Sequence, residues 1–429
     1  MKRVLVLLIL ALPLCLSAQN TKVREEVRAD HQLASGPDRL YPFDAPKLTK
    51  RPRGYREAYV SVYARHGSRY AYTKKTYTFL RDAMNEAAEN DNLTPYGDSL
   101  RNILEPFFNV AINRTGDLTR KGWQQHTRIA ATMLKSFPKA FPRHAVIDAC
   151  VSPSMRSAMS MTAFCLSLGQ KRPDLKIYEH QSHDDIYATR PNHGNPLPAY
   201  KQICQPNPLT EDIEDFLIRK VDWKAILGRI FINPEAVVGD RSLFRSMDYL
   251  WMLVAGMNSL DDDIVPDVSG IFTADEFAAM WEVDNYHRFQ EYYNYLGSCC
   301  SVWDDIVEKA DARLASKSRG ADLRFGHDHV IQTLLMIANI RDFGHFVDNT
   351  DELAMWYQTY YSPMATNLQL VFYTPRRKNK PVLVKLLLNG SESCFSGLEP
   401  VKGPYYNWDE LKYFLAERTA GFCERIPIK

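Results

Sequence analysis

The stretch AYVSVYARHGSR occupies residues 58–69 and joins an apolar run to a polar turn. Its first seven residues are small, aromatic or β-branched and mostly apolar, which is typical of a strand that is covered on both faces. The next five residues place two arginines and a histidine around Gly67. Ligands of open α/β sheets bind at the carboxyl ends of the strands. The stretch therefore predicts an α/β fold with a polar site directly after this strand.

Two later segments repeat the order of strand followed by polar residues. Residues 145–151 predict a buried strand, and Arg156 follows in the first turn of a helix that Ser152-Pro153 would cap. Residues 321–326 predict a third strand, and His327-Asp328 follows at the start of the next helix. If the three strands share a parallel sheet, their polar residues converge on one pocket.

The remaining patterns complete a coarse picture of the domains. Thr119 predicts the N-cap of a helix that ends near Ser136, and Thr273 with Glu276 has the spacing of a capping box. Residues 368–373 and 381–388 predict a hairpin with a solvated basic turn, and residues 19–54 an extended arm. We predict an α/β domain over residues 19–169 and 316–429, with a central, mostly parallel sheet flanked by helices. Residues 170–315 are predicted to form an inserted, mostly helical cap.

The first eighteen residues have the pattern of a secretory signal peptide. Lys2 and Arg3 precede an apolar run from Val4 to Leu16, and a small-residue cleavage site follows at residues 16–18. A lipoprotein anchor would use Cys15, but the bulky Leu14 before it argues against that reading. No later stretch is apolar and long enough for a membrane span. We expect an exported protein, either periplasmic or secreted.

Composition excludes several classes of protein. The 429 residues are 45% hydrophobic and 24% charged, values that exclude a disordered, collagenous or coiled-coil chain. Without Lys2 and Arg3 the 53 basic residues fall to 51, which equals the number of acidic residues. We therefore expect no nucleic-acid partner, because there is no global basic field, and any anion must bind a local cluster. Nothing in the sequence specifies an oligomeric state.

Seven cysteines remain once Cys15 is removed with the leader. Export permits disulfides, but an odd number leaves at least one thiol unpaired within the chain. None of the spacings is that of a C-x-x-C pair, so a structural zinc site is not predicted. The histidines at 180, 183 and 193 are interpreted as structural or surface residues. We expect neither a metal nor a cofactor.

The three polar segments together suit the transfer of a phosphoryl group. A neutral imidazole held in one orientation is a competent nucleophile, a role that we assign to His66. The guanidinium groups of Arg65, Arg69 and Arg156 would bind the phosphate oxygens in fork geometry, and His327 would donate a further hydrogen bond. Gly67 would let the backbone pass close to the phosphate. Asp328 would protonate the leaving alkoxide and then activate water.

The motifs resemble those of a known family. Residues 65–69 are similar to the RHGxR core of the RHGxRxP motif of histidine acid phosphatases, and His327-Asp328 resembles their distal HD motif. Asp117-Leu118-Thr119 with Gly122 and Gln125 resembles their LTxxGxxQ segment. The resemblance implies a histidine-phosphatase α/β domain, a phosphohistidine intermediate, and catalytic roles for His66 and Asp328.

Further stretches are more similar to the multiple inositol polyphosphate phosphatase branch, which is phytase-like. They are residues 65–70, 271–273, 364–368, 386–389 and 404–406. Two positions depart from the patterns, because Ala71 replaces the motif proline and His327-Asp328-His329 stands where the branch often has His-Ala-Glu. The second departure makes Asp328 the donor and weakens any transfer of the branch's substrate preference.

The function that these residues predict is hydrolysis of small phosphate monoesters, with inositol polyphosphates such as phytate as the expected substrates. One alternative is a broad-specificity acid phosphatase or sugar-phosphate phosphatase of the same fold. Another is a non-catalytic protein that binds a phosphorylated ligand. The presence of both His66 and Asp328 argues against mere binding, because binding needs neither a nucleophile nor a proton donor.

Overall fold

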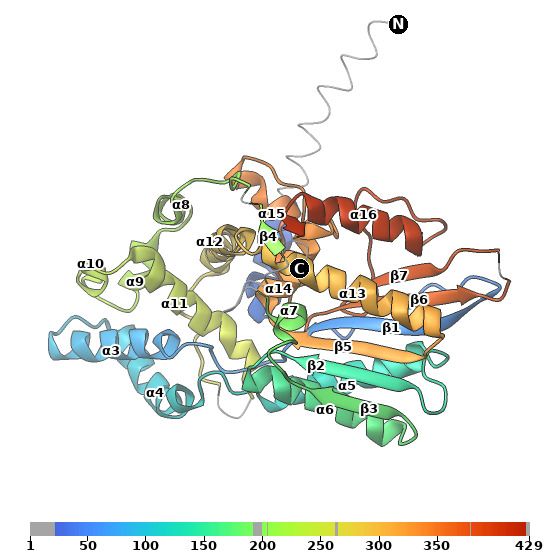
Figure 1. Cartoon of the computed structure of the whole chain (residues 1–429). Helices are drawn as coiled ribbons and strands as arrows, with labels where there is room; N and C mark the ends of the chain where they lie inside the picture. Colours follow the sequence, from blue (N-terminus) through green and yellow to red (C-terminus); the bar gives the residue numbers. More distant parts are fainter. Residues whose placement is uncertain (1–21, 192–199, 204, 262–264, 378, 426–429) are drawn as a thin grey trace, which may run out of the picture.

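The computed structural model describes residues 22–191, 200–203, 205–261, 265–377 and 379–425, and the predicted leader lies outside them. A large sheet with covering helices forms one half of the molecule, and a group of helices forms the other (Figure 1). Within the described part of the chain, no helix combines the length and hydropathy needed to cross a membrane.

The main sheet is mixed, with strand order β3-β2-β5-β1-β6-β7-β8 and with β9 beside β7. Its strands are β1 (Tyr55–Arg65), β2 (Val146–Val151), β3 (Lys176–His180), β5 (Gly320–Gly326), β6 (Asn367–Pro375), β7 (Leu383–Leu388), β8 (Ser391–Glu392) and β9 (Tyr405–Asn407). The pairings β3-β2, β2-β5 and β5-β1 are parallel, as predicted, whereas every pairing from β1-β6 onward is antiparallel. The predicted hairpin is confirmed as β6-β7, and its short connection makes this half of the sheet antiparallel.

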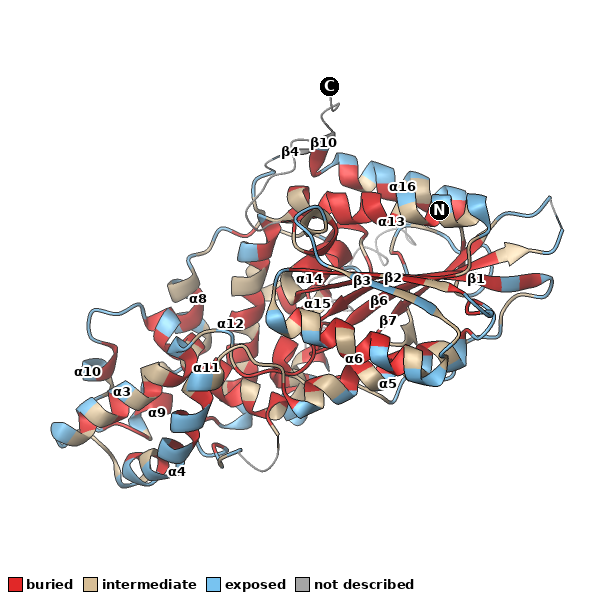
Figure 2. Ribbon diagram, turned by 60° about the horizontal axis from the view of Figure 1, so that its bottom comes forward, coloured by how far each residue is buried: buried red, intermediate tan, exposed pale blue. Residues whose placement is uncertain are grey.

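Strand β1 lies at the centre because its side chains suit two apolar surroundings. Val60, Val62 and Ala64 face one hydrophobic core, and Tyr59 and Tyr63 face the other. The period of two residues separates them onto opposite faces of the sheet. Figure 2 shows the inner strands buried along their length, whereas the covering helices are buried only on their inner sides.

Helices cover both faces of the sheet. Helices α5 (Arg120–Ser136) and α6 (Met155–Lys171) pack on one face, where Ile129 and Phe164 join the core of Val60 and Val62. Helices α13 (Leu296–Ser316), α14 (Asp328–Ile337) and α16 (Trp408–Ala420) lie on the other face. The α/β fold class is confirmed by this arrangement. Thr119 caps α5 as predicted, but α6 begins at Met155 after Ser154 and so later than the Ser152-Pro153 cap predicted.

The second half of the molecule is helical. It contains α3 (Lys75–Glu89), α4 (Pro95–Ala111), α8 (Ile213–Lys220), α9 (Trp223–Gly228), α10 (Pro234–Val238), α11 (Leu243–Gly256) and α12 (Ala274–Tyr293). Thr273 and Glu276 form the predicted capping box at the start of α12. The described part of the chain also holds the short helices α7 (Ile186–Thr189) and α15 (Leu353–Trp356) and a small sheet of β4 (Tyr200–Gln202) and β10 (Cys423–Arg425).

The helical half does not coincide with the range predicted for the cap, residues 170–315. Strand β3 and helix α13 fall inside that range but belong to the sheet and its covering layer. Helices α3 and α4 fall outside it, yet α3 packs against α11. The reason is that α3 and α4 bury apolar faces that include Met84 and Leu104 in the same core as Trp251 of α11. Apolar periodicity predicts that a face is buried without saying against what.

The prediction of an extended arm over residues 19–54 is wrong for its first part. Residues 22–29 are helical, and α2 (His31–Ala34) follows directly. Val27 is buried, Arg24 Nε lies 2.7 Å from Glu282 of α12, and the ring of His31 stacks on Phe277. Packing on α12 stabilises these short helices, which would be marginal alone in water.

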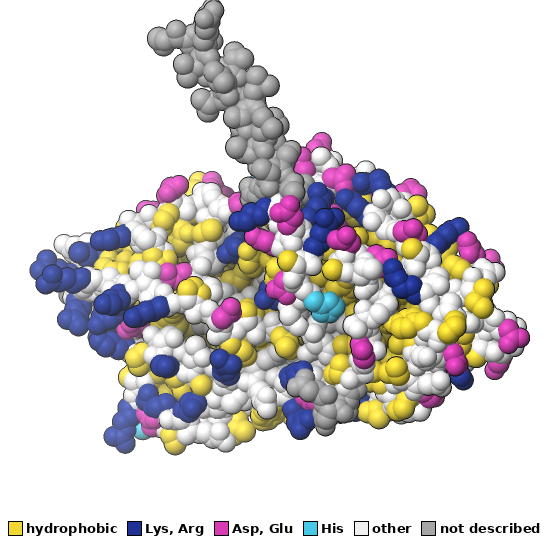
Figure 3. Space-filling view, turned by 180° about the vertical axis from the view of Figure 1, so that it is seen from behind, with side chains coloured by type: hydrophobic (Ala, Val, Ile, Leu, Met, Phe, Trp, Pro, Cys, Tyr) yellow, Lys and Arg dark blue, Asp and Glu magenta, His cyan; other side chains and the backbone are white. Residues whose placement is uncertain are grey.

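Exposed lysines and arginines gather at the end of the sheet where the β6-β7 turn lies, at the left of Figure 3. They include Arg53, Arg56, Arg376, Arg377 and Lys380. This end holds the amino ends of the parallel strands, so it lies opposite the edge at which the predicted site residues follow β1, β2 and β5.

Candidate active site

The register of the sheet brings the three polar segments together. Arg65, the last residue of β1, is opposite Gly326, the last residue of β5, and Val151 at the end of β2 is opposite Phe325. The backbone continues this contact, because His66 N donates to Gly326 O at 3.0 Å. The convergence predicted from the sequence is therefore present at the carboxyl edge of the strands.

A close backbone crossing fixes the loop that follows β1. A side chain added at Gly67 would lie 2.5 Å from Gly122 O, and one added at Gly122 would lie 2.3 Å from Ser68 O. Gly67 is therefore required by the approach of α5, a reason that differs from the predicted approach of a phosphate. Gln125 of α5 accepts from Ser68 N at 2.9 Å and donates to Ser68 Oγ at 2.9 Å, which ties the same loop through a side chain.

His66 is buried and has a single tautomer available when neutral. Its Nδ1 lies 3.0 Å from Gly67 O, and a carbonyl can only accept, so Nδ1 carries the proton. Nε2 then keeps its lone pair. Burial, with the positive charges of Arg156 and Arg65 next in importance, holds the pKa of His66 well below its ordinary value. The ring is therefore neutral, with Nε2 free of a proton.

The three predicted arginines differ in how far the protein itself uses them. Arg65 is 1% exposed and donates to Pro37 O at 2.5 Å and to Ser362 O at 2.9 Å. Arg69 donates to Tyr70 O at 3.1 Å and lies 3.9 Å from a carboxylate oxygen of Asp38. Arg156 lines the cavity, and its buried Nε has no hydrogen-bond partner among the described residues. Burial and then Arg69 lower the pKa of Arg156 to about 10, so the group remains protonated at neutral pH.

His327 and Asp328 begin α14. His327 is its N-cap residue, and its Nε2 lies 3.0 Å from the hydroxyl of Ser152. The ring of His327 lies edge-on to that of His66, with centroids 5.6 Å apart, and stacks on His329. Burial, followed by the charges of His329 and Arg156, holds the pKa of His327 well below its ordinary value, so the ring is neutral.

Asp328 is an ionised carboxylate in the free protein. Its Oδ2 lies 3.4 Å from Arg65 Nη2 and 3.1 Å from Arg288 Nη1. Burial raises the pKa of Asp328, but the charges of Arg65 and Arg288 outweigh that effect and hold the pKa well below its usual range. The net shift in the pKa of Asp328 is therefore downward, a direction that the sequence alone does not fix.

These groups surround a cavity of about 240 Å³ between the edge of the sheet and the helical half. Five of the six predicted site residues line it, namely His66, Arg69, Arg156, His327 and Asp328, and Arg65 lies behind them, bonded to Asp328. The lining residues that sequence reasoning missed are Tyr72, Arg190, Asp248, Met252, Asp284, His287, Arg288, Glu291, Tyr292 and Tyr295. Of these, Asp284, Arg288 and Tyr292 share one face of α12 at intervals of four residues, the one signal that could have grouped them.

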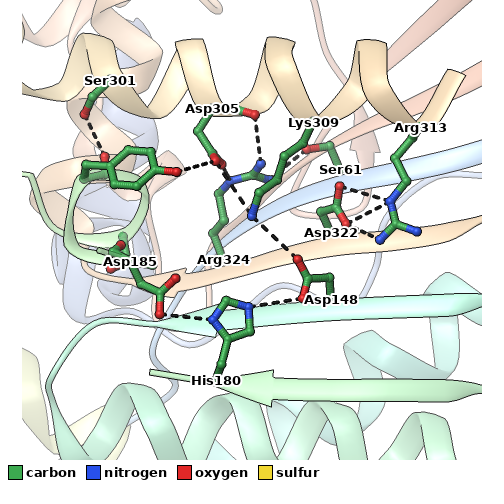
Figure 4. Close-up of polar contacts among 12 residues, drawn as sticks. Ser61, Asp148, His180, Asp185, Ser301, Asp305, Lys309, Arg313, Asp322 and Arg324 are labelled. Atoms are coloured by element: carbon green, nitrogen blue, oxygen red, sulfur yellow. Dashed lines mark hydrogen bonds and ion pairs between the residues drawn. The ribbon is translucent and has the colours of Figure 1, made fainter. Parts of the chain in front are cut away.

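A polar network beneath α13 holds the segment that carries Arg190 (Figure 4). His180 at the end of β3 lies 3.1 Å from both Asp148 of β2 and Asp185, the residue before α7. Lys309 of α13 connects Asp148 to Asp305, which pairs with the buried Arg324 of β5 at 2.5 Å. The network therefore ties α7 to three strands, and Arg190 follows α7 directly.

Comparison with known proteins gives a likeness in structure. No family model and no curated protein sequence matches the chain. The Bifidobacterium longum multiple inositol polyphosphate phosphatase, in complex with inositol hexasulfate, superposes with a TM-score of 0.70 at 18% identity, over 90% of this chain and 98% of its own. The phytase from D. castellii superposes with a TM-score of 0.61 at 14% identity, over 91% of this chain and 85% of its own. The chain therefore shares the fold of these proteins, as the resemblance of its motifs implied.

The backbone crossing gives a prediction about stability. Gly122→Ala should lower the free energy of unfolding by about 1–3 kcal/mol, because the new methyl group meets backbone atoms that cannot rotate away. Gly169→Ala in α6 is the matched control, since its methyl group would meet only Ile177 at 3.6 Å. The control should be neutral or slightly stabilising. Denaturant unfolding of both variants checks this. Equal losses in the free energy of unfolding would contradict the close backbone approach of Gly67 and Gly122.

Proposed function

We propose that the chain is an exported phosphomonoesterase that hydrolyses inositol polyphosphates such as phytate through a phosphohistidine intermediate. The observation that carries the proposal is a neutral, buried His66 with an unprotonated Nε2 in a cavity lined by Arg69 and Arg156. The likeness in fold to inositol polyphosphate phosphatases supports the substrate class. A broad-specificity acid phosphatase remains the alternative within the same fold.

The reaction would proceed in two displacements at phosphorus. In the first, His66 Nε2 attacks the phosphorus atom, the bond to the ester oxygen breaks, and Asp328 gives its proton to the leaving alkoxide. In the second, water attacks the phosphorus of the phosphohistidine, the N–P bond breaks, and Asp328 accepts a proton from the water. Inorganic phosphate leaves, and His66 returns to the neutral state.

The arginines and His327 would stabilise the charge on the transferred group. Arg69 and Arg156 bring donors to the cavity that the described residues leave partly unused. Arg65, bonded to two backbone carbonyls, contributes a fixed positive charge behind the site. Donors fixed before the reaction need no reorganisation when negative charge develops, which is why such groups lower the barrier.

Export is proposed on the leader pattern of residues 1–18. Expression of the full chain in a bacterial host should yield a mature protein that begins at Gln19, because the small residues Ser17 and Ala18 form the cleavage site. Amino-terminal sequencing of the periplasmic or secreted fraction checks this. An uncleaved chain, or lipid attached at Cys15, would contradict it.

The nucleophile is tested by removing its imidazole. His66→Ala should reduce the release of phosphate from both phytate and p-nitrophenyl phosphate by at least about a thousandfold, because the covalent step loses its nucleophile. Wild-type protein quenched in mid-turnover should carry phosphate on His66, read by mass spectrometry. His144, exposed and remote from the cavity, supplies the control His144→Ala, which should keep full activity. A His66 variant that remains active would contradict the proposal. Wild-type protein that binds phosphate without turnover would favour the non-catalytic alternative.

The role of Asp328 as general acid is tested by comparing substrates whose leaving groups differ in their need for a proton. Asp328→Asn should slow the first displacement strongly for inositol phosphates, whose alkoxide needs a proton, and much less for p-nitrophenyl phosphate. Rapid-quench measurement of the phosphorylated protein with each substrate separates this step from hydrolysis of the intermediate. Equal losses for both substrates would remove Asp328 from the acid role and direct attention to His329.

A further inference from the structure

Arg288 of α12 bridges two carboxylates in the wall of the cavity. Its Nε lies 2.8 and 2.7 Å from the two carboxylate oxygens of Asp284, and its Nη1 donates to Asp328 Oδ2 at 3.1 Å. Its Nη1 also donates to the hydroxyl of Tyr292 at 2.9 Å. Asp284 is buried and lies one turn earlier on the same helix, so the position of the guanidinium is fixed from within α12.

The charges around Asp328 come from several elements of the fold. The charged or titratable groups that face it are Arg65 and His66 from the end of β1, Tyr72 from the loop that follows, Arg156 from α6, Arg190 after α7, Asp284, Arg288 and Tyr292 from α12, His327 and His329 at α14, and Tyr357. Asp248 of α11 and Asp38 also interact electrostatically with Asp284. Among the described residues, Arg65 and Arg288 are the two whose guanidinium groups form ion pairs with Asp328.

An acid that is ionised before the reaction needs a source for its proton. A phosphate dianion bound at Arg69 and Arg156 would repel the carboxylate of Asp328 and offset the field of the guanidinium groups. Both effects favour a proton on Asp328. Arg288 opposes that change throughout, because its link to Asp284 keeps it beside Asp328.

We propose that Arg288 is a positioning residue that keeps Asp328 ionised and oriented until a dianion binds, and that it sets the pH above which the bound state no longer takes up a proton. The inference rests on the proposed function, since it gives Asp328 the acid's part. Under this proposal, binding of the substrate and uptake of a proton by Asp328 are linked. Arg288 would then fix the alkaline limit of activity without touching the phosphate.

Sulfate is the probe that separates this role from catalysis, because it is a tetrahedral dianion that does not itself titrate in the working range. Calorimetric titration of sulfate in buffers of different ionisation enthalpy gives the number of protons taken up at each pH. Wild-type protein should take up close to one proton at acid pH and progressively less as the pH rises. The share due to Asp328 should vanish in Asp328→Asn.

The pH at which half of this uptake is lost is the quantity that Arg288 controls. Arg288→Gln should move it upward by roughly one pH unit, because a neighbouring positive charge is removed. Arg288→Lys should return the midpoint close to that of wild-type protein, because lysine supplies the positive charge again. Asp284→Asn should move it downward, since Arg288 then has one carboxylate partner fewer. Arg219→Gln is the matched control, an arginine of α8 that also pairs with two carboxylates but lies outside the cavity.

Shifts of opposite sign in Arg288→Gln and Asp284→Asn support the inference, because damage to the fold would not produce them. Uptake that persists in Asp328→Asn would mean that a histidine receives the proton, and a midpoint that stays in place in Arg288→Gln would reduce Arg288 to a structural role. Either result overturns the inference. If wild-type protein hydrolyses no phosphate ester, the proposed function fails, whereas the sulfate titration still decides the role of Arg288.

Discussion

Repulsion among buried guanidinium groups is the constraint on which the rest of this structure depends. Arg65, Arg69, Arg156, Arg190 and Arg288 lie at or behind one cavity, and the pKa of Arg156 falls to about 10 through burial and the charge of its neighbours. Such groups stay together only if backbone carbonyls, carboxylates or an anionic ligand offset their charge. Arg65 has the carbonyls and Arg288 has Asp284, whereas the buried Nε of Arg156 has no hydrogen-bond partner among the described residues. The positive charge that the protein leaves without an offset therefore favours binding of an anion beside Arg156, where this residue lines the cavity.

The sheet supplies the rigidity that this arrangement needs. Parallel pairing in register brings the ends of β1, β2 and β5 to one edge, and the crossing of Gly67 and Gly122 locks the loop that carries His66. The network from His180 to Arg324 then extends the same support to α7 and Arg190. The charged groups that follow β1, β2 and β5 are therefore held by elements whose position depends on the sheet rather than on the ligand. Preorganisation of this kind is what makes fixed charges effective towards a transition state.

The residues that the sequence placed correctly are those whose position follows from local order. His66, Arg156 and Asp328 each follow closely on the end of a strand with a clear apolar pattern, so parallel pairing brings them together. Arg190, Arg288 and Tyr292 could not be placed in this way. The location of Arg288 and Tyr292 depends on how the helical half meets the sheet, and an amphipathic pattern does not specify the partner of a helix. Arg190 follows α7, which long-range ion pairs hold to the strands. The same gap explains why the sequence does not place α3 and α4 with α11. It also explains why the sequence predicts a phosphate, and not α5, beside Gly67.

Three carboxylates around Arg288 respond to pH with opposite signs. Burial raises the pKa of Asp248 to about 7 and that of Asp284 to about 6, whereas the pKa of Asp328 lies well below its usual range. A carboxyl with a raised pKa binds its proton more tightly in the folded state, so its contribution to stability is complete below pH 4 and is lost as the pH rises towards its folded pKa. Asp328 contributes in the opposite sense, and its stabilisation is lost only as the pH falls through its lowered pKa. Between these limits, on the acid side of neutral, Asp328 is still ionised, whereas the contributions of Asp248 and Asp284 fall as the pH rises. As Asp284 ionises towards neutral pH, it becomes the charged partner that holds Arg288 beside Asp328.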